Sequence, residues 1–282
     1  MNYRHAFHAG GFADVAKHAV LARILVHLKA KEAAFRVIDT HAGAGLYDLT
    51  GPEASRTGEW RDGIARLLAA RRAPEVEGLL APYLDVVASF NRDGPLRSYP
   101  GSPAIILAHL RPQDRLLACE LEPGAARALS RHLDRDHRAR VVAIDGWTGL
   151  GAYVPPKERR GLVLVDPAFE QPDELARLAD GLAAAHGKWA TGTYLLWYPI
   201  KQRGEREAFV RRLRALAIPK TLCAELTVGP PGDEERLHGS GLIVVNPPWT
   251  QERELATLLP ALAAVLAGDK GSARLDWLAG ER

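Results

Sequence analysis

The chain has 282 residues, of which 47% are hydrophobic and 25% charged, and its 37 basic and 34 acidic residues leave a formal net charge of +3. This composition excludes a disordered or fibrous protein, and neither a secretory leader nor an apolar run long enough to cross a bilayer stands out. We therefore expect a single cytoplasmic globular domain over residues 1–282, with no membrane partner, and with Cys119 and Cys223 as buried thiols.

The amino-terminal segment is dense in aromatic, basic and glycine residues. Tyr3, Arg4 and His5 suit a flexible segment that contacts an RNA base. A metal site built from His5, His8 and His18 is the alternative, but no cysteine or carboxylate at ligand spacing supports it, so we expect no metal.

A helix is predicted next. Asp14 is placed to cap it, and Leu21, Leu25 and Leu28 recur at helical spacing, so this apolar side should lie on a sheet.

Short apolar runs then alternate with helical stretches over most of the chain. The runs are rich in Val, Ile and Leu without strict alternation, which is typical of strands covered by helices on both faces. We predict a doubly wound, mostly parallel α/β sheet. The last two strands should pair as an antiparallel hairpin at the sheet edge. The seven expected strands are residues 35–39, 115–120, 140–144, 161–165, 193–198, 222–228 and 242–245.

The segment between the first two strands is longer than one crossover helix requires. Helical patterns at residues 59–71 and 76–90 indicate a small helical insertion over residues 46–103, at the carboxyl edge of the sheet.

The first strand ends in the sequence from Asp39 to Gly45. Gly43 and Gly45 fall where the strand turns, so the backbone there can approach a ligand closely, although a plain tight turn has the same appearance. A nicotinamide-binding turn would have a third glycine where Asp48 stands, which argues against an oxidoreductase.

Carboxylates follow the next two strands. Glu120 can accept hydrogen bonds from both hydroxyls of a ribose, and Asp145 with Gly146 would lie near the base of the same nucleoside. Together with the glycine turn they favour S-adenosylmethionine (SAM) as the cofactor.

The fourth strand ends in Asp166-Pro167-Ala168-Phe169, the most informative stretch of the sequence. The lone pair of an adenine amino group is delocalised into the ring. The Asp166 carboxylate and the Pro167 carbonyl can each accept one N–H, which directs that lone pair toward a methyl donor. Phe169 offers a ring on which the base can stack. An ordinary Asp-Pro turn is the alternative.

A second motif of this kind, Asn246-Pro247-Pro248-Trp249, follows the last strand. We expect that strand to run in the opposite direction at the sheet edge. The motif is therefore interpreted as structural, or at most as a wall of the substrate cleft.

Basic residues also cluster at 131–140, 157–160 and 201–214, each beside acidic residues or histidines. These clusters are compatible with a polyanionic partner, but solvated helix faces are the simpler interpretation.

The chain resembles, over nearly its whole length, the bacterial 23S ribosomal RNA adenine-N6 methyltransferases of the RlmJ type, which modify adenine 2030. The resemblance implies a class I SAM-dependent methyltransferase with a Rossmann-like fold and a 23S ribosomal RNA substrate. We expect a monomer with no obligatory protein partner. The resemblance rests on residues 3–10, 13–18, 39–45, 56–59, 99–103, 197–199 and 246–249.

The resemblance also implies roles for individual residues. Tyr3 would touch the RNA near the target base. The family's catalytic loop reads Asp-Pro-Pro-Tyr, so Ala168 and Phe169 depart from it, and we expect activity to be retained. The implied SAM contacts are His18, His41, Ser102, Glu120, Asp145, Gly146 and Asp166.

Two other functions stay open at this point. One is an adenine or other amino methyltransferase that acts on DNA, on another RNA or on a protein. The other is a SAM-binding RNA-binding protein without catalysis.

Overall fold

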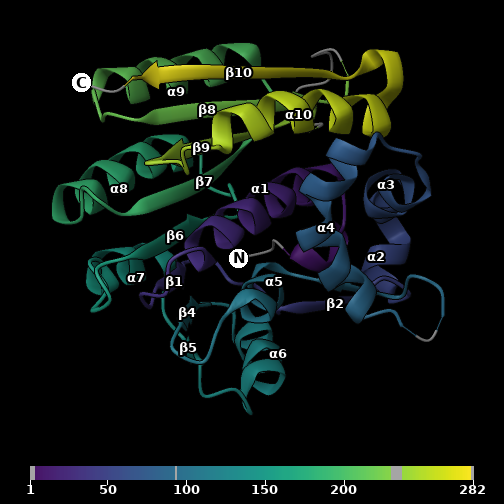
Figure 1. The fold of residues 1–282 in the computed structure, drawn as a ribbon, viewed down its shortest axis with the longest axis horizontal. Coiled ribbons are helices and arrows are strands. Elements are labelled where there is room, and N and C mark those ends of the chain that lie inside the picture. Colours follow the sequence, from purple (N-terminus) through teal and green to yellow (C-terminus); the bar gives the residue numbers. More distant parts are fainter. Residues whose placement is uncertain (1–3, 93, 230–236, 281–282) are drawn as a thin grey trace.

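The computed structural model describes residues 4–92, 94–229 and 237–280. Its centre is one eight-stranded sheet in the order β10-β8-β9-β7-β6-β1-β4-β5 (Figure 1). The strands are β1 (Arg36–Asp39), β4 (Arg115–Cys119), β5 (Ala139–Val142), β6 (Gly161–Val165), β7 (Thr193–Ile200), β8 (Thr221–Thr227), β9 (Gly239–Val245) and β10 (Ser272–Ala279).

The predicted doubly wound, mostly parallel sheet is confirmed. Strands β5, β4, β1, β6 and β7 pair in parallel, whereas β9 is antiparallel to both β7 and β8. The predicted count of seven strands and the predicted edge are wrong, because β10 pairs antiparallel with β8 and forms the edge itself. The hairpin of β8 and β9 therefore lies inside the sheet.

Helices cover both faces of the sheet and build two separate cores. On β1, for example, Val37 belongs to one core and Ile38 to the other. The first core holds side chains of α1 (Phe12–Lys29), α4 (Pro74–Ser89), α5 (Ser102–His109), α6 (Pro123–Leu133) and α10 (Gln251–Ala267). The second holds side chains of α7 (Gly146–Tyr153), α8 (Glu174–Lys188) and α9 (Arg203–Ala215). Both free cysteines are buried.

The long segment between β1 and β4 contains helices and a small second sheet. The strands β2 (Leu46–Asp48) and β3 (Ser98–Pro100) pair antiparallel. The helix predicted at 59–71 is interrupted at Gly63, which has non-helical dihedral angles. A Cβ there would lie 2.1 Å from the Gly10 carbonyl oxygen, so the amino-terminal segment passes directly against this position. The helices here are α2 (Pro52–Thr57), the π-helix η2 (Arg61–Ala65), α3 (Arg66–Ala69) and α4.

The first helix begins earlier than predicted. Gly11 is its N-cap and Phe12 its first residue, so Asp14 lies inside the first turn and is not the cap. Its side chain is nonetheless engaged there, because Asp14 Oδ2 accepts a hydrogen bond from the Gly10 amide at 3.0 Å. Short 3-10 helices lie at His5–Phe7 (η1) and Gly268–Lys270 (η3).

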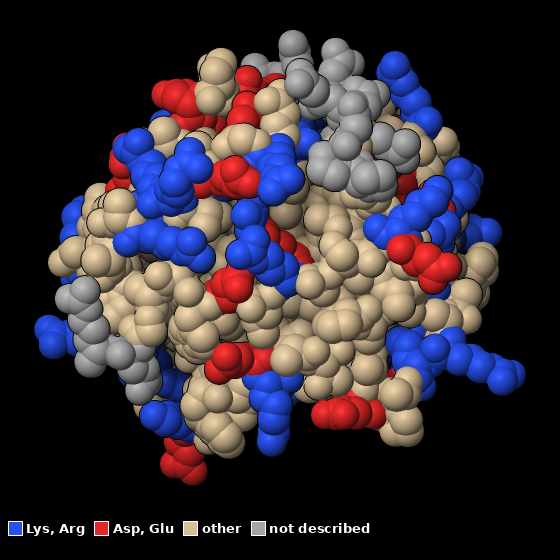
Figure 2. Space-filling view, turned by 90° about the horizontal axis from the view of Figure 1, so that it is seen from above, with Lys and Arg blue, Asp and Glu red and all other residues tan. Residues whose placement is uncertain are grey.

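Charges of both signs are interspersed on the β10 side of the molecule (Figure 2). On α9, Arg203 pairs with Glu207 and Arg212 with Asp180, so the predicted solvated helix face describes this cluster well. The cluster at 157–160, by contrast, lies in a turn before β6. Of the helices in the described ranges, none combines the length and apolar composition needed to span a bilayer.

Candidate active site

A cavity of about 640 Å³ opens at the carboxyl ends of β1, β4 and β6. It collects residues that are far apart in the sequence, and its volume falls within the range of small-molecule sites. Gly45 and Phe169 do not line it, and Tyr3 lies outside the described residues. The predicted site residues that line it are Arg4, His5, His18, His41, Gly43, Ser102, Glu120, Asp145, Gly146, Asp166 and Pro167.

The turn after β1 holds Glu120 in place. Gly43 has a φ of +63°, and a Cβ there would lie 2.2 Å from the Tyr47 hydroxyl, so only glycine suits this position. The Gly43 amide donates to Glu120 Oε2 at 2.7 Å, and the Glu122 amide donates to Oε1 at 2.7 Å. Burial raises the Glu120 pKa against these hydrogen bonds. Its remaining lone pairs can accept hydroxyl groups of a ligand.

The turn after β5 brings Asp145 and Gly146 to the cavity. Asp145 caps α7 by accepting a hydrogen bond from the Thr148 amide at 2.9 Å. A Cβ on Gly146 would lie 2.2 Å from the Thr40 carbonyl oxygen and 2.6 Å from His41 Nε2, so the His41 ring packs directly on this glycine. Burial lowers the His41 pKa to about 4, and the imidazole is therefore neutral at pH 7.

His18 lines the cavity and has one unsatisfied polar atom. Its Nδ1 is 2.8 Å from the Tyr99 hydroxyl, which in turn contacts the Tyr83 hydroxyl at 2.9 Å. Its Nε2 is buried without a hydrogen-bond partner in the described chain and lies 4.0 Å from Asp14 Oδ1. Burial lowers the His18 pKa to about 3, so the imidazole is neutral at pH 7.

Asp39 and Ser102 form a second buried polar pair. Ser102 Oγ donates to Asp39 Oδ2 at 2.7 Å, whereas Asp39 Oδ1 has no partner among the described residues. Burial raises the Asp39 pKa to about 7. The pair fixes Ser102 against the cavity wall.

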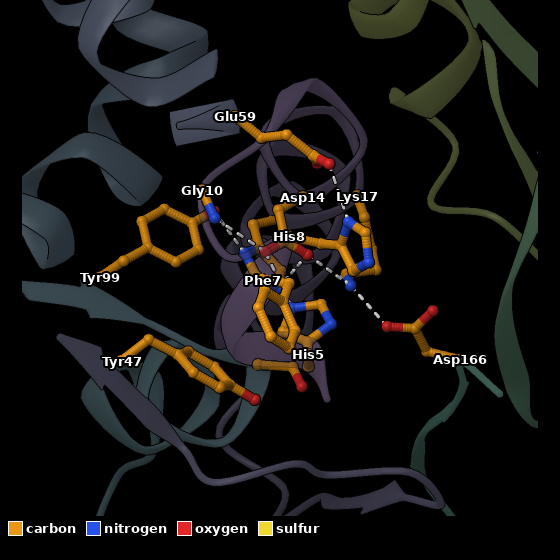
Figure 3. A network of polar contacts seen from close by, with 12 residues as sticks. His5, Phe7, His8, Gly10, Asp14, Lys17, Tyr47, Glu59, Tyr99 and Asp166 are labelled. Atoms are coloured by element: carbon orange, nitrogen blue, oxygen red, sulfur yellow. Dashed lines mark hydrogen bonds and ion pairs between the residues drawn. The ribbon is translucent and has the colours of Figure 1, made fainter. Parts of the chain in front are cut away.

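Asp166 is joined to α1 by a buried lysine (Figure 3). Lys17 Nζ lies 2.5 Å from Asp166 Oδ2 and 2.8 Å from Asp14 Oδ1. Asp14 Oδ2 is also 3.0 Å from His5 Nε2, so the network continues into the amino-terminal segment. The side chains of Lys17, Asp14 and Asp166 are 4%, 3% and 14% exposed.

The charges in this network support one another. Burial opposes ionisation of Lys17, but Asp14 and Asp166 outweigh it and raise the Lys17 pKa. Burial likewise opposes ionisation of Asp14, but His5, Lys17 and His18 hold its pKa well below the usual range. From the sequence alone, Lys17 had no predicted role and Asp14 was predicted only as a helix cap. The available signal was an Asp and a Lys three residues apart within residues 12–22, where His18 is the one other polar residue.

The residues of the loop after Asp166 have two environments, the cavity and the surface of the second core. Pro167 and Ala168 line the cavity. Phe169 has a φ of +51°, and its ring lies 5.4 Å from the Trp197 ring in an edge-on arrangement. Phe169 is partly buried and packs against the second core, whereas Trp197 packs against the first. The stacking role of Phe169 therefore stays a prediction that would require its ring to reach a bound base.

The second Pro-containing motif lies elsewhere. Because β9 is antiparallel to β7, residues 246–249 emerge at the amino ends of the parallel strands and do not line this cavity. Within the described ranges, no group of three His, Cys, Asp or Glu side chains is arranged to hold a metal ion.

Comparison with known proteins gives consistent matches over most of the chain. A sequence model of the family described as "Ribosomal RNA large subunit methyltransferase D, RlmJ" matches residues 32–279. Two proteins named "Ribosomal RNA large subunit methyltransferase J" match over 100% of both chains. The one from Escherichia coli K12 is 42% identical, and the one from Haemophilus influenzae Rd is 40% identical. A crystal structure of a Legionella pneumophila protein superposes with a TM-score of 0.88 at 33% identity, covering 95% of this chain and 98% of the other.

Proposed function

From the premise that the chain belongs to the RlmJ family of ribosomal RNA large subunit methyltransferases, we propose that it methylates N6 of adenine 2030 in 23S ribosomal RNA. Family membership makes it a SAM-dependent ribosomal RNA methyltransferase. The nucleotide, the acceptor atom and the residue roles are the proposal.

The cavity suits SAM. Glu120 would accept the ribose hydroxyls, and Asp145 with Gly146 would flank the adenine. His18 and Ser102, which also line the cavity, would bind the polar amino-acid end. When bound, SAM supplies a methyl group activated by a positively charged sulfur.

The Asp166 carboxylate and the Pro167 carbonyl would accept the two N–H groups of the target adenine. Each hydrogen bond draws the nitrogen toward tetrahedral geometry and localises its lone pair. The carboxylate also stabilises the positive charge that develops on the nitrogen. Pro167 restricts the backbone of the loop, so these acceptors are positioned before the base arrives.

Lys17 would act as a positioning residue for Asp166. Its Nζ engages Oδ2, and no hydrogen bond from the described chain reaches Oδ1. The carboxylate is therefore held by one oxygen while the other can accept a hydrogen bond from a base. This arrangement, a carboxylate anchored by Lys17 at the wall of the cavity, is the observation that carries the proposal.

The departure of Ala168 and Phe169 from Asp-Pro-Pro-Tyr leaves both proposed acceptors in place. Losing the second proline frees one backbone angle, and losing the phenol removes one hydrogen bond. The reaction type should be unchanged, although the rate can differ.

Nucleoside mass spectrometry of 23S RNA from cells that lack the protein tests the proposal. N6-methyladenosine at position 2030 should disappear, return with the natural protein, and stay absent with Asp166→Ala. An unchanged modification level in the deletion strain would refute the substrate assignment.

A further inference from the structure

A second cavity, of about 190 Å³, lies at the opposite edge of the sheet from the active site. It is formed where α1 ends, where β6 and β7 begin, and where the chain leaves β9. Its basic lining residues are His27, Lys31, Arg159 and Arg160, and the described lining includes no Asp or Glu.

The positive charge of this cavity is not neutralised from within. Arg160 donates to the carbonyl oxygens of Leu28 at 2.5 Å and Ala33 at 2.8 Å, and no carboxylate pairs with it. The side chains of Lys31 and Arg159 are exposed and have no hydrogen bond or ion pair in the described chain.

The nearest carboxylates are already committed to other partners. Glu254 is bound by Arg23 through two hydrogen bonds, and Glu158 is bound by Arg36 in the same way. Asp114, which acts electrostatically on Arg160, is bound by the Arg111 side chain. An anion entering the cavity would therefore meet unopposed cations.

One wall of the cavity is rigid. Asn246 has a φ of +51°, and its Nδ2 donates to the carbonyl oxygens of Ala190 and Gly192, each at 2.8 Å. Thr193 Oγ1 donates to the Asn246 carbonyl at 3.1 Å. Pro247 and Pro248, which line the cavity, then restrict the backbone further.

Trp249 follows this wall directly and is 85% exposed, more than any other large hydrophobic residue of the described chain. An indole ring so exposed contributes little to folding, because it buries almost no apolar surface. A fixed loop therefore presents an aromatic ring to solvent beside a basic pocket.

We propose that the basic pocket and Trp249 form a second RNA-binding site, in which the pocket holds a backbone phosphate and the indole stacks on an unpaired base. Guanidinium and ammonium groups beside an exposed ring are the combination that binds single-stranded nucleic acid. This inference rests on the proposed function in one respect, since the RNA bound here is a segment that flanks the target adenine in the same ribosomal RNA.

The separation of the two sites suits one RNA molecule. Strand β6 runs from Gly161, at this pocket, to Asp166, at the active site, a span of about 17 Å at the usual rise per residue. Because β6 is buried throughout, an RNA strand that reached both sites would pass over the surface, and it would need more than the about five stacked nucleotides that this straight line equals.

The test compares RNA affinity in full-length variants that leave the active site intact. The variants are Trp249→Ala and the double substitution Lys31→Gln with Arg159→Gln. The matched control, Arg71→Gln with Lys270→Gln, removes two exposed charges that line neither cavity. Dissociation constants are measured by fluorescence anisotropy over a range of salt concentrations, with a 23S fragment carrying the target adenine and single-stranded flanks.

Trp249→Ala should weaken binding about fivefold or more. The pocket double variant should reduce the slope of log affinity against log salt by about 1 to 2 relative to the control. Affinity for SAM should not change in any variant. If the variants have the same RNA affinities and salt slopes as the control, the site is overturned. It is also overturned if the variants lose binding to a poly-aspartate peptide but bind RNA as tightly as the natural protein does.

Failure of the proposed function is distinguishable in the same experiment. Mass spectrometry can show that the natural protein leaves the fragment unmethylated while Trp249→Ala still weakens RNA binding. In that case the second site stands and the reaction assignment is wrong.

Discussion

The two Pro-containing loops of this protein, residues 166–169 and 246–249, follow buried strands and end in an aromatic residue, yet they lie at opposite edges of the sheet. Asp166 follows a parallel strand, is 14% exposed and is paired with Lys17. Asn246 follows an antiparallel strand and bonds to backbone carbonyls, and Trp249 is 85% exposed. The direction of the preceding strand and the charge that a neighbouring helix supplies distinguish the two loops, whereas their sequences do not.

The largest expected difference between the loops is catalytic. Asp166→Asn should lower methyl transfer at saturating RNA by about a hundredfold or more, because a neutral amide is a weaker acceptor for the adenine amino group. Asn246→Ala should leave that rate within about twofold. Single-turnover transfer of labelled methyl groups measures both, and equal losses in the two variants would contradict the assignment.

The next difference concerns stability. Lys17→Met removes the shared partner of two carboxylates, so the free energy of unfolding should fall by about 3 kcal/mol or more. Lys31→Gln, two residues beyond the end of the same helix, should change it by less than about 0.5 kcal/mol. Urea unfolding compares the variants, and a Lys17→Met protein as stable as Lys31→Gln would show that the network contributes nothing.

A smaller difference depends on pH. The Asp39 pKa is raised from 3.8 to about 7, so between these values the folded protein binds a proton that the unfolded chain has released. Raising the pH through this window therefore destabilises the natural protein relative to Asp39→Asn. Between about pH 5 and about pH 8 the relative change should be on the order of 2 kcal/mol.

Thermal unfolding over this pH range measures the Asp39 effect, with Asn246→Ala as a control whose difference from the natural protein should not depend on pH. A constant difference for Asp39→Asn as well would mean that Asp39 is ionised throughout.

The smallest effect is expected from Ala168→Pro, which restores the second proline of the family's loop. Both proposed acceptors are present already, so the rate should change by no more than about tenfold, through a stiffer backbone alone. Methyl transfer to a 23S fragment measures it. Activity in the substituted protein only would show that the natural loop is not competent.

The sequence predicted the parallel part of the fold well, because fully buried strands such as residues 161–165 are continuous apolar runs bounded by turns. It did not predict β10, because this partly exposed edge strand includes Arg274 and Asp276 and is not a continuous apolar run. It also missed the three-residue strands β2 and β3, which are too short to show any period.

For the site, residues at strand ends were predictable because parallel strands bring their carboxyl ends to one edge. The contact between Lys17 and Asp166 was not predictable, since these residues are 149 positions apart and only the packing of α1 against the sheet brings them together. The positive φ of Phe169 and the contact of its ring with Trp197 have no signature in the sequence either, whereas its stacking role stays a prediction.

The most direct test of the central claim is a crystal structure of the protein with S-adenosylhomocysteine and an RNA that contains the target adenine. The adenine N6 should lie about 2.7 to 3.2 Å from both an Asp166 carboxylate oxygen and the Pro167 carbonyl oxygen, and should face the sulfur. A target base bound beside Asn246, or an Asp166 side chain turned away from the nucleoside cavity, would contradict the account.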